Sequence, residues 1–347
     1  MADTSTPSTM RIWQYDAATP TMHQHLELKT SQPVPQPKPD QHLIKVLAVG
    51  LNPVDYKIAE APYVGGFIVK KPATPGLDIS GRIVTPAAGS NLKPGDLVYG
   101  ASSTNPFAGN GLAEYVAAPA TSIAPVPGSI STIIAGGVPV AAMTAWDSLV
   151  PYIRSGSRVF INGGSGGVGT YGIQIAKGLG AHVTVACSSR NAELCRSLGA
   201  DVVLDYTERP LLEQLREAAA APGRPFDHVV DYVFSDPALF YEAHTYTAPE
   251  AKFVEVAGGP SWAFIKFALG AHIWPGFLGG GKRKFEMFAC VIKTEGLVEV
   301  ANWIKDGRIK PVTDKVFEFE KTVEAFEYLR KGRAVGKVVV TVATEEK

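Results

Sequence analysis

The chain has 347 residues, 46% of them hydrophobic and 19% charged, which is the composition of a globular protein long enough for two domains. Its 33 basic and 33 acidic side chains give a formal net charge of +0, so we expect no affinity for nucleic acid or for an anionic membrane surface. Three cysteines are too few for a disulfide framework, and the first ten residues lack the apolar core of a signal peptide, so we expect a cytoplasmic protein.

The first part of the chain is predicted to consist of short β-strands. Pro and Gly turns, such as Lys93-Pro94-Gly95-Asp96, separate the runs of β-forming residues. These runs cover residues 42–49, 81–84, 97–100 and 113–117. Short strands between turn signals indicate a small barrel or sandwich.

From Arg158 onward, strands and helices are expected to alternate. The predicted strands cover residues 158–162, 183–187, 202–205, 227–233 and 253–257, and the helices between them 168–179, 192–198 and 211–221. Parallel strands need crossover helices, and right-handed crossovers place these helices on both faces of a sheet. The alternation therefore predicts a doubly wound parallel sheet.

The last part of the chain departs from this alternation. Its predicted elements are a helix at 295–305, a strand at 316–319, a helix at 322–330 and a strand at 337–342.

An apolar stretch at 261–277 is interrupted by Lys266, His272 and Pro275, which argues against a membrane span. We expect this stretch to form an apolar flap at an active site or a subunit contact.

A glycine-rich turn follows the predicted strand at 158–162. It reads Gly164-Ser165-Gly166-Gly167-Val168-Gly169, and a helix begins within it. Gly164 allows a tight turn, Gly166 lets the backbone approach a pyrophosphate, and Gly169 lets helix and strand pack closely. The phosphates would then meet the free N–H groups of the helix, including those near Gly167 and Val168. In this context the turn predicts a dinucleotide site.

The end of the second strand of the alternating region indicates which dinucleotide binds. An NAD-preferring site carries Asp or Glu there, to accept hydrogen bonds from the ribose diol. This chain has Ser188-Ser189-Arg190 instead. Two hydroxyls and a guanidinium suit a 2′-phosphate, so we expect NADP(H) as the cofactor.

Several motifs occur along the chain in a fixed order. They are Asn52-Pro53-Val54-Asp55-Tyr56-Lys57, Pro75-Gly76-Leu77-Asp78-Ile79-Ser80-Gly81, Lys93-Pro94-Gly95-Asp96-Leu97-Val98-Tyr99-Gly100, Ala113-Glu114-Tyr115, the glycine turn, and Gly336-Lys337-Val338-Val339-Val340. In this order they resemble the motifs of the medium-chain dehydrogenase/reductase superfamily, in particular its zinc-free quinone oxidoreductases and alkenal (enone) oxidoreductases. The resemblance covers nearly the whole chain and is more specific for the superfamily than for a substrate.

This resemblance implies a two-domain α/β protein. A GroES-like, β-rich catalytic domain would comprise residues 1–140 and 286–347, and a Rossmann NADP(H)-binding domain residues 141–285. The resemblance also implies a homodimer.

The same resemblance bears on zinc. Zinc alcohol dehydrogenases of this superfamily place a Cys where this chain has Asn52, and a Gly-His-Glu where it has Gly76-Leu77-Asp78. Neither Asn nor Leu is a usual zinc ligand. We therefore expect no metal site and no alcohol oxidation through a metal-bound alkoxide.

The resemblance places candidate catalytic residues in the Asn-Pro-x-Asp-x-Lys motif. Lys57 would lie beside the nicotinamide ribose and the substrate carbonyl. An ammonium at that place stabilises a developing enolate oxygen. The alternative for Lys57 is a solvated surface lysine. Asn52 would donate to substrate or hold a turn. Tyr56 and Tyr63 are candidate proton donors, with aromatic packing the commoner role. Asp55 and Asp78 are expected to anchor turns and domains.

Further residues are assigned to the cofactor through the same resemblance. Thr144 would lie near the nicotinamide carboxamide, and Tyr206 near the adenosine phosphate. Val256 would offer its backbone to the nicotinamide side, and Gly336 and Lys337 would reach the cofactor from the C-terminal part. Each has a structural alternative, such as a helix-capping hydroxyl for Thr144 or a strand-end aromatic for Tyr206.

Three functions remain open from the sequence. The first is an NADPH-dependent reductase that acts on a free enone, enal or quinone. The second is a trans-acting enoyl reductase that partners a polyketide synthase, because such enzymes share the Asn-Pro-Val-Asp and Lys motifs. The third is a structural or regulatory NADPH-binding protein without turnover, against which the intact glycine turn and Lys57 argue.

Overall fold

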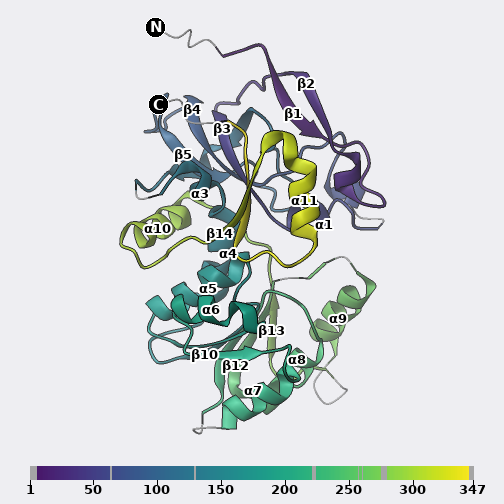
Figure 1. Ribbon diagram of the computed structural model, residues 1–347, viewed down its shortest axis with the longest axis vertical. Helices are drawn as coiled ribbons and strands as arrows, with labels where there is room; N and C mark the ends of the chain where they lie inside the picture. The colour runs from purple at the N-terminus through teal and green to yellow at the C-terminus, as the bar shows by residue number, and fades with distance from the viewer. Residues whose placement is uncertain are drawn as a thin grey trace. The chain divides into compact units, whose positions relative to one another are not determined.

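The computed structural model describes residues 6–62, 65–128, 130–220, 224–256, 258–259, 261–274 and 280–343. The chain divides into two compact units (Figure 1). Unit 1 comprises Met1–Met143, Cys290–Gly307 and Pro311–Lys347, and unit 2 comprises Thr144–Ala289 and Arg308–Lys310. Unit 1 is therefore built from segments that are far apart in the sequence.

Unit 1 is dominated by a seven-stranded sheet in the order β14-β15-β3-β4-β5-β7, with β6 paired to β3. Its pairs are antiparallel except for β14 and β15, which run parallel. Strands β1 and β2 form a separate antiparallel pair. The bounds are β1 Thr9–Gln14, β2 Glu27–Pro33, β3 Gln41–Leu51, β4 Asp78–Thr85, β5 Leu97–Ala101, β6 Tyr115–Pro119, β7 Ile123–Pro125, β14 Thr313–Glu318 and β15 Lys337–Thr341.

Helices of unit 1 pack tightly against its central strands. A β-carbon at Gly50 on β3 would lie 2.4 Å from the carbonyl oxygen of Gly136, so only glycine lets α3 approach this strand so closely. Helix α4 follows at once and continues into unit 2. The helices are α1 Val54–Lys57, α2 Gly65–Ile68, α3 Thr132–Gly136, α4 Pro139–Leu149, α10 Thr294–Lys305 and α11 Thr322–Arg330.

Unit 2 contains a six-stranded sheet in the order β10-β9-β8-β11-β12-β13, and all its pairs are parallel. Counted along the chain, this is the order 3-2-1-4-5-6 of a doubly wound dinucleotide-binding fold. Such folds bind ligands at the carboxyl ends of the strands, where the strand order reverses. The strands are β8 Arg158–Asn162, β9 His182–Cys187, β10 Val202–Asp205, β11 Phe226–Asp231, β12 Thr247–Glu255 and β13 Lys284–Met287.

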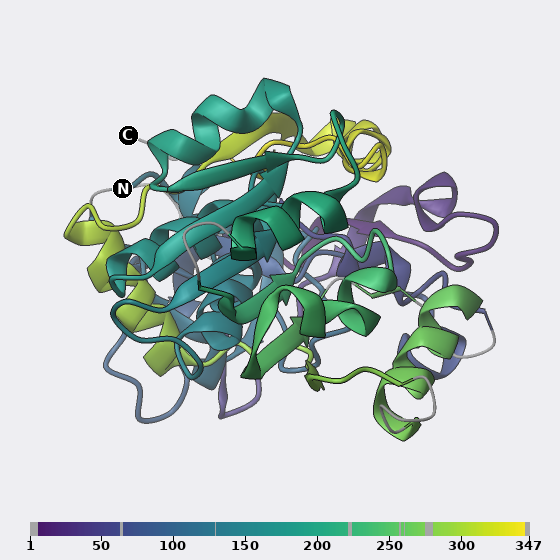
Figure 2. The same ribbon diagram turned by 90° about the horizontal axis from the view of Figure 1, so that it is seen from below.

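Helices are arranged around this parallel sheet (Figures 1 and 2). An aromatic cluster that includes Phe160, Phe240 and Phe253 forms the buried core beneath α7 and α8. The helices are α5 Gly167–Gly178, α6 Ala192–Ser197, α7 Leu211–Ala220, α8 Ala238–Tyr241 and α9 Trp262–Ile273.

Helix α9 presents large apolar side chains to solvent. Trp262 is 68% exposed, Leu269 55% and Ile273 68%, and they follow one another at helical spacing. The opposite face of α9 packs Phe264 and Phe267 against the aromatic core. The stretch expected to be a flap or a subunit contact is thus a helix over its described residues, whereas residues 275–277 lie outside the described part. Among the described helices, none is long and apolar enough to cross a membrane.

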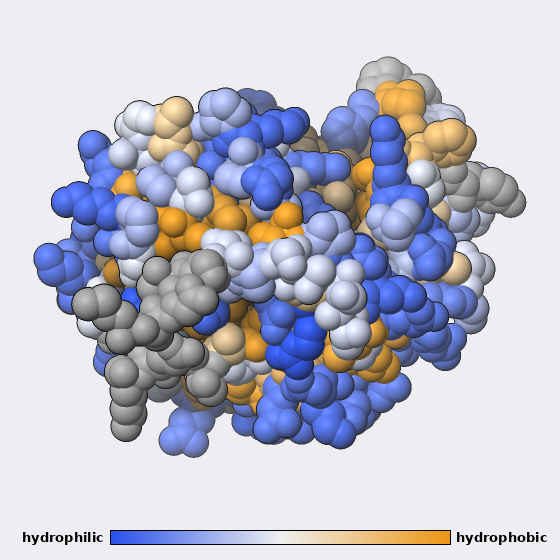
Figure 3. Space-filling model, turned by 90° about the horizontal axis from the view of Figure 1, so that it is seen from above, coloured by the Kyte–Doolittle hydropathy of each residue, from blue (hydrophilic) through white to orange (hydrophobic). Residues whose placement is uncertain are grey.

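The predicted fold class is confirmed, and most predicted elements lie within two residues of the observed ones. The predicted strand at 253–257 is longer at its start, because β12 begins at Thr247, and Ala257 lies outside the described residues. The elements that were not predicted are strands β1, β2, β7 and β13 and helices α1, α2, α3, α4, α8 and α9. Across the face of the molecule in Figure 3 the surface is largely hydrophilic, with apolar side chains showing between polar ones.

Candidate functional site

The glycine turn of unit 2 lies between β8 and α5, at the carboxyl end of the sheet. Gly163 has a positive φ of 85°, and a β-carbon at Gly169 would lie only 2.1 Å from the Gly163 carbonyl oxygen. A β-carbon at Gly164 would lie 2.8 Å from Cβ of Val185 on the neighbouring strand. The turn is therefore packed against itself and against β9, as a close helix–strand approach requires.

The outer side of the same turn is open. A β-carbon at Gly166 would meet a single atom, 3.5 Å away, so backbone is accessible there. Gly166 is the N-cap of α5 and contributes no side-chain cap, and Gly167 and Val168 are the first two helical residues. The first N–H groups of a helix have no intrahelical acceptor. The four predicted phosphate-binding residues thus form one cradle, and this cradle fits a pyrophosphate.

The loop after β9 carries the residues predicted to read the adenosine end of the cofactor. Ser188 is half-buried, while Ser189 and Arg190 are exposed. Asn191 in the same loop donates from Nδ2 to Oγ of Ser165 at 2.9 Å. This bond ties the loop to the glycine turn, and sequence reasoning did not identify it.

Asp205 also lies at this edge of the sheet, because it pairs with Cys187 in the register of β10 and β9. Its Oδ1 accepts hydrogen bonds from the Thr207 N–H at 2.8 Å and the Thr207 hydroxyl at 2.6 Å. Hydrogen bonds from Ser189 and Thr207 lower the pKa of Asp205 below its usual value. Its other oxygen, Oδ2, is buried and has no hydrogen-bond partner in the described structure.

Asp205 is therefore hydrogen-bonded to the loop at 188–190, which was predicted to determine the preference between NADP(H) and NAD(H). Sequence reasoning treated it only as the last residue of a strand, although its place at the end of the third Rossmann strand was the available signal. Tyr206, the predicted adenosine neighbour, follows it and is 55% exposed.

The point where the strand order reverses lies between β8 and β11. There Nδ2 of Asn162 donates to Oδ1 of Asp231 at 2.9 Å, and burial raises the pKa of Asp231. Val256, which follows β12, donates its N–H to the Asp231 carbonyl at 3.0 Å. The backbone of Val256, which was predicted to face the nicotinamide, is thus hydrogen-bonded to the end of β11, one of the two strands between which the order reverses.

In unit 1 the predicted residues Asn52 and Lys337 lie in one buried polar network with Asp78. Nζ of Lys337 donates to Oδ1 of Asn52 at 2.5 Å and to Oδ2 of Asp78 at 3.2 Å. Nδ2 of Asn52 donates to Oδ2 of Asp78 at 2.9 Å. Both side chains of the ion pair are almost fully buried, at 4% and 0% exposure.

Asp55 joins the same network through backbone groups. Its carboxylate accepts the N–H of Asn52 at 2.7 Å and that of Leu77 at 3.1 Å. Burial raises its pKa to about 7, and the nearby Asp78 adds to this rise. Burial likewise raises the pKa of Asp78, against which the Lys337 ammonium acts. Asp55 and Asp78 thus hold turns of unit 1, the role that was expected of them within this domain.

Helix α1 presents the two remaining candidates of the motif. Tyr56 is half-buried beneath the Arg330 guanidinium, whose Cζ lies 4.6 Å from the ring centroid, and burial raises the pKa of its hydroxyl. Lys57 is the last residue of α1 and is half-buried. Thr144 is buried on α4, whereas Tyr63 lies outside the described residues.

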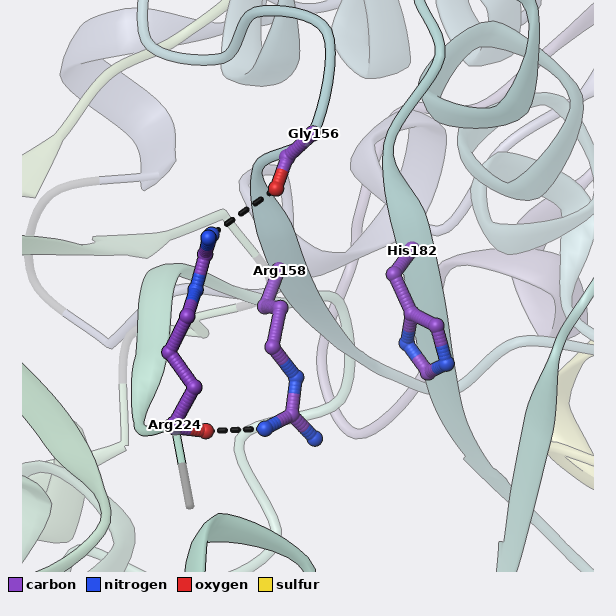
Figure 4. A pocket seen from close by; sticks show the side chains of 4 residues that line it. All are labelled: Gly156, Arg158, His182 and Arg224. Atoms are coloured by element: carbon purple, nitrogen blue, oxygen red, sulfur yellow. Dashed lines mark hydrogen bonds between the residues drawn. The ribbon is translucent and has the colours of Figure 1, made fainter. Parts of the chain in front are cut away.

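A small pocket at the opposite edge of the unit 2 sheet is lined by Gly156, Arg158, His182 and Arg224 (Figure 4). Arg158 and His182 begin β8 and β9, so the pocket lies far along the strands from the glycine turn. Both guanidiniums donate to backbone carbonyls, and Arg224 also pairs with Asp227 at 2.5 Å. These arginines close the amino edge of the sheet, and the pocket is not the dinucleotide cradle.

Among the residues that the structure describes, no three His, Cys, Asp or Glu side chains gather in a group that would hold a metal ion. At the positions named above for zinc, Asn52 and Asp78 are bonded to the Lys337 ammonium, and an ammonium excludes a second cation from the same oxygens.

Two family models match this chain. The alcohol dehydrogenase GroES-like domain matches residues 38–128, and the zinc-binding dehydrogenase domain matches residues 198–340. The first match falls in unit 1, and the second begins in unit 2, at the end of α6.

Curated relatives and solved structures resemble the chain over nearly its full length. The trans-enoyl reductase pgmF of Aspergillus terreus is 41% identical over 97% of each chain. The chloroplast envelope quinone oxidoreductase homolog of Arabidopsis thaliana is 30% identical, over 89% of this chain and 92% of the relative. The structure of the quinone oxidoreductase from Coxiella burnetii superposes with a TM-score of 0.80 at 28% identity, over 96% and 99% of the two chains.

Proposed function

We propose that this chain, which belongs to the medium-chain dehydrogenase/reductase superfamily as a quinone oxidoreductase-like member, reduces an activated C=C bond or a quinone. The chain is an oxidoreductase, and its family uses a nicotinamide cofactor. The observation that carries the proposal is the open glycine cradle at the N-terminus of α5, in a sheet of order 3-2-1-4-5-6.

We take the cofactor to be NADPH. Arg190 is exposed beside the hydroxyls of Ser188 and Ser189, and a guanidinium forms strong, charge-assisted hydrogen bonds with phosphate oxygens. Asp205 is a carboxylate at this edge of the sheet that a 2′-phosphate would have to tolerate. Its hydrogen bonds with Thr207 direct Oδ1 into its own loop.

When bound in the glycine cradle, NADPH would supply a hydride to the electron-poor carbon of the substrate. Negative charge then develops on the substrate's carbonyl or quinone oxygen, and Lys57 stabilises it with its ammonium. Tyr56 would supply a proton to the carbanion or oxyanion, because its hydroxyl stays protonated at neutral pH. The proposal excludes zinc from the reaction, since Asn52 and Asp78 are engaged by Lys337.

The test is to follow NADPH absorbance at saturating cofactor with a panel of enones, quinones, saturated ketones and enoyl thioesters. We expect turnover with the first two classes or with enoyl thioesters, and none with saturated ketones, whose C=O bond is not conjugated. NADPH binding without turnover on any member would contradict the proposal and favour a non-catalytic binding protein.

The role of Lys57 has its own variant. Lys57→Ala is expected to lower turnover about tenfold to a thousandfold and to change the Kd for NADPH much less, because the ammonium acts on the developing oxyanion. Lys45→Ala, on β3 of the same unit, is the matched control and should leave both values unchanged. If NADPH affinity falls while turnover at saturation stays normal, Lys57 is a binding residue only.

A trans-acting enoyl reductase is a second candidate. Two relatives named as trans-enoyl reductases, from Aspergillus terreus and from Penicillium oxalicum, align with 97% and 98% of this chain, at 41% and 32% identity. Under this candidate the substrate is an enoyl thioester held on the acyl carrier of a polyketide synthase. Higher kcat/KM for a carrier-bound enoyl thioester than for the same acyl group on a short thiol would support it, and equal values would favour free substrates.

The proposal includes a homodimer in the cytosol, with no nucleic-acid partner. Light scattering coupled to size-exclusion chromatography tests the dimer, because a mass near the 36.9 kDa of one chain would contradict it.

A further inference from the structure

We propose that Lys337 is a positioning residue, whose buried ammonium locks Asn52 and Asp78 together and thereby fixes the segments that bear Lys57 and Thr144. This inference rests on the proposed reductase function for its kinetic test. It assigns Lys337 a role through its neighbours, which differs from contact with the cofactor.

The first support is the completeness of the contacts around Asn52. Its Oδ1 accepts from Lys337 at 2.5 Å, and its Nδ2 donates to Asp78 at 2.9 Å and to the Gly50 carbonyl at 3.3 Å. An amide held at both ends has one orientation only. Asn52 therefore has its side chain engaged inside the protein, and the ammonium of Lys337 determines which way that amide faces.

The second support is the link from Asp78 to α4. Its Oδ1 accepts the N–H of Val140, the second residue of α4, at 2.7 Å. A carboxylate at a helix N-terminus satisfies an orphan N–H and interacts favourably with the helix dipole. Thr144 lies one turn further along the same helix. The first turn of the helix that carries Thr144 is therefore capped by a carboxylate that is paired with Lys337.

The third support is the link from Asn52 to α1. Asp55 accepts the backbone N–H groups of Asn52 and Leu77, and so clamps the turn before α1 to the residue before β4. Tyr56 and Lys57 follow directly on α1. One network thus joins the start of β15, the start of β4, the α1 turn and the first turn of α4.

The fourth support is that the ammonium is delivered from fixed backbone. Gly336 has a φ of 86°, and a β-carbon there would lie 2.4 Å from the Val312 carbonyl oxygen. The Lys337 N–H donates to that same oxygen at 2.9 Å. The backbone from which the Lys337 side chain extends toward Asn52 and Asp78 is therefore fixed.

The energetics also favour a positioning role. Removing two charges from water costs several kcal/mol per ion, and apolar residues often replace a buried ion pair without loss of stability. Removing one partner alone leaves an unpaired buried charge and is strongly destabilising. The experiment therefore needs a variant that removes both charges together.

The test compares Lys337→Met with the double variant Lys337→Met/Asp78→Asn, which removes both charges of the ion pair together. Arg11→Met is the control, because it breaks another ion pair of unit 1, in which Arg11 Nε lies 2.8 Å from Glu114 Oε1. We measure kcat, the primary isotope effect with 4-deuterated NADPH, the Kd for NADPH, and hydrogen exchange of residues 52–57 and 139–144.

The double variant should fold, bind NADPH within about threefold of wild type, and lose about tenfold to a hundredfold in kcat with a larger isotope effect, because misplaced groups slow the chemical step. Exchange should rise in both segments, and Arg11→Met should change neither kcat nor this exchange. If Lys337→Met alone does not fold, the double variant decides.

A folded double variant with wild-type kcat overturns the inference, and so does a loss of NADPH affinity with normal kcat, which would make Lys337 a cofactor contact. If wild type turns over no substrate of the panel, the proposed function fails instead. Hydrogen exchange then still decides, since unchanged exchange in both segments would overturn the positioning role by itself.

Discussion

Gly169 and Gly163 approach each other so closely that a β-carbon on Gly169 would lie 2.1 Å from the Gly163 carbonyl oxygen. Neither residue can move apart to make room for this β-carbon, because the backbone of both glycines is closely packed. Gly169→Ala is therefore expected to displace α5 from β8, with loss of NADPH binding and a clear fall in melting temperature. Differential scanning calorimetry and a cofactor titration measure the two effects.

Gly166→Ala is the matched variant in the same turn, because its β-carbon would meet only one atom, at 3.5 Å. We expect a nearly unchanged melting temperature but weaker NADPH binding, since the added methyl group occupies the side from which a pyrophosphate approaches. Equal melting temperatures and equal NADPH affinities for both variants would contradict this description of the turn.

Arg190→Ala tests the preference for the 2′-phosphate. A hydrogen bond to a charged group is worth about 1.5–3 kcal/mol, so we expect NADPH affinity to fall about tenfold to a hundredfold and NADH affinity to stay nearly constant. Arg196→Ala, an exposed arginine on α6, controls for general loss of positive charge. Equal losses for NADPH and NADH would show that Arg190 supports the loop and does not contact the 2′-phosphate.

Asp55 predicts a pH dependence of stability. Burial raises its pKa from 3.8 to about 7 in the folded protein, so between these values the folded state holds a proton that the unfolded state has lost. The free energy of unfolding therefore falls as pH rises through this window, by up to on the order of 4 kcal/mol from this group. Above the window, the folded protein holds a buried carboxylate.

The comparison is with Asp55→Asn, which does not titrate. Urea unfolding at pH 5 and pH 8 should give a wild-type minus variant difference in the free energy of unfolding that is smaller at pH 8, because only wild type carries the Asp55 carboxyl group. A difference that grows with pH would mean that Asp55 stays ionised throughout and is stabilised by its two backbone donors.

Chelators are expected to leave both activity and melting temperature unchanged, because the Lys337 ammonium is already hydrogen-bonded to Oδ1 of Asn52 and Oδ2 of Asp78. Elemental analysis of the purified protein accompanies the assay. Stoichiometric zinc that is removed together with activity would contradict the zinc-independent proposal.

The local elements were largely predictable from the sequence, but the contacts that join them were not. The strand at Arg158–Asn162 and the helix after it have clear periodicity and a glycine turn between them. Helix α4 escaped prediction because its first turns are almost uniformly small and apolar, which gives no amphipathic pattern. Helices of this kind are defined by their burial, which only the folded chain shows.

The buried network illustrates the same limit at the candidate site. Asn52 and Asp78 were singled out by motif, yet their partner Lys337 is 285 residues away from Asn52 in the sequence. Asp205 was likewise recognisable as a strand end, but its bond with Thr207 depends on how the loop turns back. Residue types could therefore be predicted, whereas their pairing depended on the fold.

The apolar row on α9 has a practical consequence for how this protein is assayed. Trp262, Leu269 and Ile273 form an exposed apolar surface in the native protein, to which we expect solvatochromic dyes to bind. A dye-based melting experiment would begin from a bright baseline and report the release of dye from α9 together with unfolding. Circular dichroism records the backbone itself, and it is the method by which variants of this chain are best ranked.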